Sequence, residues 1–67
     1  MGFFLNLSNK NMTVGGVRQL IEFGNEEIEL KIQNKTLKIA GEKLVIERFD
    51  ENEIIISAKT FSRFEFL

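Results

Sequence analysis

Apolar and polar residues alternate along most of the chain, with a period of two. Ile28, Leu30 and Ile32 alternate with charged residues, and Ile54 and Ile56 repeat the pattern later in the chain. A period of two directs successive side chains to opposite faces of a β-strand, whereas a helix needs apolar residues every three to four positions. The pattern predicts strands at residues 3–7, 11–15, 17–23, 26–32, 35–40, 43–48, 53–59 and 62–67.

Residues that favour tight turns separate these runs. Gly15, Gly16, Gly24 and Gly41 are expected to be structural turn residues, because glycine tolerates the positive φ angles that hairpin turns need. Short strands with such turns between them are typical of an antiparallel sandwich or barrel. We therefore predict an all-β fold, a small antiparallel β-sandwich or partly open barrel of seven to eight short strands in a meander, with no substantial helix.

The segment 17–23 fits the alternation least well. Strict alternation places Gln19 on the core side and directs Leu20 outward. A β-bulge near Gly15–Gly16 or at Arg18 would return the apolar residues to the core face, since a bulge adds one residue to a strand.

The length of 67 residues limits the chain to a single β domain over residues 1–67. Burial of about 60% of the unfolded surface contributes roughly 100 kcal/mol at ~25 cal/mol per Å² of apolar area. Ordering the chain costs about the same at ~1.5 kcal/mol per residue. A core of this size is marginal, so a partner surface is expected to add stability.

The composition excludes several kinds of chemistry. The chain has neither Cys nor His, which removes disulfides, thiolate sites, the commonest general base and the commonest metal ligand. We predict no catalytic residue, no cofactor and no metal site. The net charge of −1 argues against nucleic acid as a partner. No apolar run is long enough for a membrane span and the first residues lack the pattern of a secretory signal, so a cytoplasmic location is predicted.

Two other functional classes stay open as alternatives. One is a small β-barrel that binds a ligand or nucleic acid, to which the aromatic and basic residues near the C-terminus would contribute by stacking bases. The other is a carboxylate-based enzyme, which would need a concave pocket holding Glu26, Glu27 or Asp50. We interpret these carboxylates as solvated turn and strand-edge residues, and the rings of Phe64 and Phe66 as core residues because of their spacing.

Apolar residues also occur on both faces of several predicted strands, in the runs at 3–5, 44–46 and 54–56. Only one face of a sheet can form the core of such a small domain, so the second set is expected to meet another chain. The predicted interaction surface consists of Phe3, Phe4, Leu20, Val45, Ile55 and Phe61.

The order of these segments resembles the YabP/YqfC sporulation protein family. The most specific element is Leu-x-Ile-x-Gly-Glu-x-Leu-x-Ile at residues 37–46, and the resemblance extends through the segments at 17–23, 26–30, 50–56 and 64–67. Ile-Glu-Phe at 21–23 and the ending at 66–67 are nearer the YqfC branch. The chain departs from the family at 33–35 and at 57–58, where members usually have a glycine.

The resemblance implies a protein of endospore-forming Firmicutes that is made during sporulation, typically in the mother cell. The YqfC branch is associated with a membrane-bound partner, YqfD, and with spore envelope assembly, and the family has no catalytic residues to transfer. We therefore predict a non-catalytic interaction or scaffold module in endospore formation. It would act by self-association as a homo-oligomer, expected to be a dimer, or by docking to a YqfD-like membrane protein at the forespore membrane.

Overall fold

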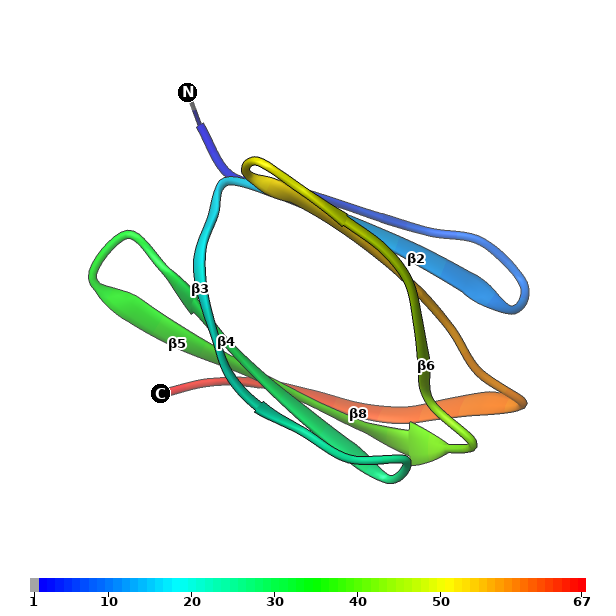
Figure 1. Cartoon of the computed structure of the whole chain (residues 1–67). Helices are drawn as coiled ribbons and strands as arrows, with labels where there is room; N and C mark the ends of the chain where they lie inside the picture. The colour runs from blue at the N-terminus through cyan, green and yellow to red at the C-terminus, as the bar shows by residue number, and fades with distance from the viewer. Residues whose placement is uncertain (1) are drawn as a thin grey trace.

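The computed structural model describes residues 2–67, and these residues form eight antiparallel strands and no helix (Figure 1). Every predicted strand is present, and its ends lie within two residues of the predicted ones. The strands are β1 (Phe4–Leu7), β2 (Asn11–Gly15), β3 (Val17–Phe23), β4 (Glu27–Ile32), β5 (Lys35–Glu42), β6 (Val45–Asp50), β7 (Glu53–Ser57) and β8 (Thr60–Phe66).

The eight strands form two four-stranded sheets that lie face to face as a sandwich (Figure 1). Sheet A has the strand order β1-β2-β7-β6, and sheet B has the order β3-β4-β5-β8. The predicted meander therefore extends only over β3, β4 and β5, because β2 pairs with β7 and β5 pairs with β8 across long stretches of sequence. No strand of one sheet pairs with a strand of the other, which excludes a closed barrel among the described residues.

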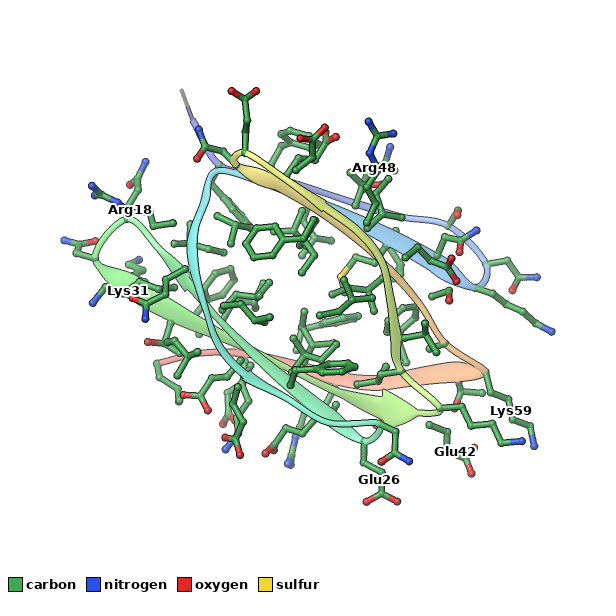
Figure 2. The ribbon with its side chains drawn as sticks, in the orientation of Figure 1. Arg18, Glu26, Lys31, Glu42, Arg48 and Lys59 are labelled. Atoms are coloured by element: carbon green, nitrogen blue, oxygen red, sulfur yellow. The ribbon has the colours of Figure 1, made fainter. Side chains whose placement is uncertain are left out.

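The core lies between the two sheets and is apolar throughout (Figure 2). Its residues come from alternate positions of the strands, as the period of two predicts. No polar or charged residue of the described chain is buried. The buried residues are Met12, Val14, Val17, Ile28, Leu30, Ile32, Leu37, Ile39, Leu44, Ile54, Ile56 and Ala58.

The strand β3 contains a bulge at Arg18, one of the two places predicted for it. The register with β4 shifts between Val17 and Gln19, so Arg18 is the extra residue. Gln19 then lies opposite Lys31 on the outer face, and Leu20 turns inward and packs against the core instead of facing outward. A second shift between Leu20 and Glu22 was not predicted.

The four glycines predicted as turn residues occupy different settings. Gly16 has φ 81° between β2 and β3, where the chain passes from sheet A to sheet B, and Gly24 follows β3. Gly15 is the last residue of β2. Gly41 lies inside β5 and does not form the predicted turn, which falls at Lys43 with φ 55°.

The close approach of β5 and β8 explains why glycine stands at position 41. A Cβ atom on Gly41 would overlap the carbonyl oxygen of Thr60, and it would lie 3.2 Å from the Cα atom of Phe61. The register of β5 and β8 also shifts at this point, between Ala40 and Gly41. The absence of a side chain at Gly41 therefore allows β5 and β8 to approach closely at a bulge, as glycine commonly does where two backbones meet.

Backbone hydrogen bonds tie the two sheets together at the corners of the sandwich. On the side bounded by β3 and β6, the Val17 N–H donates to Asn52 O at 2.9 Å and the Leu44 N–H donates to Asn25 O at 2.8 Å. On the side bounded by β1 and β8, the rings of Phe3 and Phe66 meet edge to face, with centroids 5.8 Å apart.

Candidate interaction surfaces

The outer face of sheet A carries three of the predicted contact residues. Phe4 lies opposite Gly15, and its ring occupies the space that a side chain at Gly15 would take. Ile55 points outward from β7, between the buried Ile54 and Ile56. Val45 begins the edge strand β6 and is 49% exposed. These three residues give the outer face of sheet A an apolar character at its centre and at two of its corners.

Two pairs of polar side chains on the same face contact each other. The Ser57 hydroxyl donates to Glu47 Oε2 at 2.6 Å, and the Arg48 guanidinium lies 3.1 Å from the Asp50 carboxylate. Charged groups that already have partners on the same sheet compete less for a binding partner. The apolar residues are then the groups on this face that gain most from being covered.

The outer face of sheet B is charged. Its central strands carry Glu29 and Lys31 on β4 and Lys38 on β5, and Lys31 points away from the sandwich in Figure 2. The Lys38 ammonium lies 3.5 Å from the carboxylate of Glu27. The edge strand β8 adds Glu65 opposite Lys38. The residues on this face are mostly charged and interact with water and with one another. Covering this face with an apolar partner would therefore bring no gain in stability.

The two open sides of the sandwich expose apolar residues that point inward. Phe23 lies opposite the buried Ile28, yet it is 54% exposed because β3 is an edge strand. Phe66 lies opposite the buried Leu37 and is 53% exposed at the edge strand β8. An edge strand has no neighbour on one side, so its inward side chains stay half covered. Other apolar residues exposed in this way are Leu7, Phe49 and Phe64.

The six predicted contact residues therefore fall into three groups. Phe4, Val45 and Ile55 share the outer face of sheet A, as described above. Phe3 lies at the open side between β1 and β8 and contacts Phe66. The remaining two, Leu20 and Phe61, pack against the core.

Sequence reasoning missed the half-exposed rings on the open sides of the sandwich. Their alternation marks Phe64 and Phe66 as core residues, and they do face the core side of sheet B. The missing information was that β8 lies at an edge, which depends on the non-sequential pairing of β5 with β8. Phe61, which breaks the alternation, faces inward because the bulge near Ser62 shifts the register.

The candidate chemical groups are not brought together. Glu26 and Glu27 lie at the start of β4 in sheet B, whereas Asp50 ends β6 in sheet A at the opposite end of the sandwich. Glu26 points into solvent in Figure 2. Within residues 2–67, no group of three or more Asp or Glu side chains is arranged to hold a metal ion. No helix in this part of the chain is suited to crossing a membrane.

One end of the sandwich is hollowed between the connections of the two sheets. A depression of about 650 Å³ opens there, lined by backbone and polar groups of Gly16, Val17, Arg18, Gln33, Asn34 and Asn52. Its wide mouth and the single charged side chain distinguish it from the enclosed, apolar pockets that bind small molecules.

Comparison with known proteins assigns the chain to a family by its sequence. No curated protein and no solved structure matches it. The model of the YabP family matches residues 5–62, which covers most of the chain and both sheets of the sandwich. That match does not separate the YabP and YqfC branches, so the assignment to the YqfC branch stays a prediction. The family is a sporulation protein family without known catalytic activity, and this chain belongs to the YabP family.

Proposed function

We propose that the chain is a non-catalytic interaction module that acts in assembly of the spore envelope during endospore formation. It works by binding protein, either a second copy of itself or a membrane-anchored partner, for which a YqfD-like membrane protein is the candidate. Its place would be the mother-cell side of the forespore membrane, which it would reach through that partner. Membership of the YabP family supports the cellular process.

The observation that carries the proposal is the contrast between the two outer faces. Phe4, Val45 and Ile55 point outward from sheet A, whereas the outward residues of sheet B are mainly charged. An exposed apolar set on one face of a small domain marks a surface that is covered by another protein. The apolar face of sheet A is therefore the surface proposed to bind the membrane-anchored partner.

The proposal is tested by adding charge to that face. The double variant Val45→Lys and Ile55→Lys introduces two ammonium groups at the centre and the corner of the apolar surface. Replacing the chromosomal copy with this variant is expected to lower the titre of heat-resistant spores and the recovery of the chain with the mother-cell membrane fraction. About a tenfold loss or more is expected, which is the effect of ~1.4 kcal/mol of lost binding energy.

A matched control adds the same two charges to the other face. Gln19→Lys and Ala40→Lys lie on the outer face of sheet B, where Ala40 is opposite Glu27, and this double variant is expected to behave like the natural chain. Far-ultraviolet circular dichroism of both purified variants checks that each remains folded. If the folded Val45→Lys and Ile55→Lys variant sporulates and binds membranes as well as the control does, the apolar face of sheet A has no part in the function.

A further inference from the structure

The edge strand β8 is the least protected of the four sheet edges in residues 2–67. β1 has only four residues, β3 contains two register shifts, and β6 contains one. β8 has seven residues and one register shift, beside Ser62, and its pairing with β5 is regular from Arg63 to Phe66. Short length and bulges protect sheet edges against pairing with another strand; β8 is long, and its one bulge lies in its first half, so the end of the strand is regular.

The hydrogen bonds to β5 reveal which backbone groups of β8 remain free. Leu67 and Thr36 form a reciprocal pair, in which the Leu67 N–H donates to Thr36 O at 2.8 Å and the Thr36 N–H donates to Leu67 O at 3.4 Å. Hydrogen-bonded and non-hydrogen-bonded pairs alternate along an antiparallel ladder. Residues 65 and 63 therefore also direct their backbone groups toward β5, and Phe64 and Phe66 direct theirs away from sheet B.

We propose that two copies of the chain pair antiparallel through their β8 edges in the register centred on Phe64, which joins their B sheets into one continuous sheet. In this register the Phe64 N–H of each copy donates to the Phe64 carbonyl of the other. Phe66 lies opposite Ser62 of the second copy. The inference deepens the proposed function, on which it rests, by naming the surface used for self-association.

The charges on β8 complement each other only in this register. Arg63 and Glu65 share the outer face of sheet B, opposite Ala40 and Lys38 of β5. Centring the pair on Phe64 places Arg63 of each copy opposite Glu65 of the other, so that symmetry creates two ion pairs. These are non-hydrogen-bonded positions, where opposite Cα atoms lie about 4.5 Å apart and side chains interact most closely.

Other registers fail for two reasons. Centring the pair on Arg63 or on Glu65 would place like charges opposite each other. A shift of one residue in the pairing would set the inward Phe64 against an outward residue of the second copy, which mixes the two faces of the sheet.

Pairing in this way also covers the apolar side of the sandwich. The rings of Phe64 and Phe66 face the opening between β1 and β8, where Phe3 and Leu7 are exposed as well. A twofold axis perpendicular to the joined sheet brings the same opening of the second copy alongside. The half-exposed rings of each copy then meet those of the other, which provides the apolar contact that a single edge strand lacks.

Charge reversal at β8 tests both the interface and its register. Sedimentation equilibrium of the purified chain from micromolar to millimolar concentration is expected to show a dimer that forms with increasing concentration. Arg63→Glu alone or Glu65→Arg alone places like charges at both pairs, and each is expected to weaken dimerisation about tenfold or more. Both residues are exposed, so circular dichroism of the variants is expected to match that of the natural chain.

Two rescue measurements separate pairing in this register from a general effect of charge. The double variant Arg63→Glu and Glu65→Arg restores opposite charges at both positions and is expected to dimerise like the natural chain. An equal mixture of the two single variants is expected to form heterodimers, because each then meets the opposite charges of the other. The control Lys31→Glu reverses a charge on the same outer face away from the edge, and it is expected to leave the dimer unchanged.

Three outcomes would overturn the proposal. They are a natural chain that stays monomeric at every concentration, single variants that dimerise as well as the natural chain, and a double variant that fails to recover. If the chain is monomeric, the β8 edge would instead be open to pairing with a strand of another protein. None of these results bears on the apolar face of sheet A, whose Val45→Lys and Ile55→Lys variant is expected to dimerise normally.

Discussion

Ile54 and Ile55 are neighbours in β7 that point to opposite faces of sheet A. Ile54 is fully buried, whereas Ile55 is half-buried on the outer face. Replacing either residue with valine removes one methylene group and keeps a β-branched side chain of high strand propensity. The two variants therefore differ only in the face from which the methylene group is lost.

The expected effect follows from the burial of each side chain. A fully buried methylene contributes about 0.8 kcal/mol through removal from water, and the small cavity left by Ile54→Val adds to this. We expect Ile54→Val to lower the free energy of unfolding by about 1 kcal/mol. Ile55→Val is expected to lower it by about 0.3 kcal/mol or less, because the lost atoms are partly in solvent already.

Thermal unfolding followed by circular dichroism, at one fixed protein concentration, measures the difference. For a domain of this size, 1 kcal/mol corresponds to a Tm shift of about 4–8 °C. Ile54→Val should therefore melt several degrees below the natural chain, and Ile55→Val should melt within about 2 °C of it. Equal shifts for the two variants, or a larger shift for Ile55→Val, would refute the assignment of the two faces of β7.

Two further predictions concern strand packing and surface charge. Gly41→Ala is expected to lower the free energy of unfolding, measured in urea, by about 2–3 kcal/mol, because the new Cβ atom would overlap the Thr60 carbonyl oxygen. In the control Gly24→Ala, the new Cβ atom would make only ordinary contacts, so the free energy of unfolding should change by less than about 1 kcal/mol. Equal effects at the two glycines would contradict the close approach of β5 and β8. Lys38→Gln removes an exposed ion pair with Glu27 and should cost less than about 1 kcal/mol in the same assay, with the difference shrinking further in 1 M salt. A larger loss would mean that this pair is more than a solvated surface contact.

The positions of the strands and the faces of most side chains could be predicted from the sequence. Alternation is a local property, so Ile54 and Ile56 are identified as core residues and Ile55 as an outward residue without any knowledge of the sheet order. A bulge near the start of β3 was also predictable, because strict alternation would have buried Gln19, although alternation did not choose between Gly15–Gly16 and Arg18 as its place. The second register shift in β3 was not, because Ile21 fits a strand equally well with or without it.

The candidate surfaces were predictable only in part. Val45 and Ile55 were identified from apolar residues on both faces of a strand, and they do share the outer face of sheet A. The exposure of Phe64 and Phe66 was not predictable, because their spacing is that of core residues. Gly41 was assigned to a turn because glycine is frequent there, whereas the structure uses it for a close backbone contact inside β5.

The sequence by itself determined that this is an all-β chain of eight short strands with two distinct faces and without His or Cys. Turn residues and a period of two are enough for this, since both act between residues close together in the chain. Only the tertiary structure decided which strands lie at the edges, and therefore which inward rings remain exposed. That order depends on β2 meeting β7 and β5 meeting β8, contacts between distant segments that are selected by burial of the shared core and leave no local pattern in the sequence.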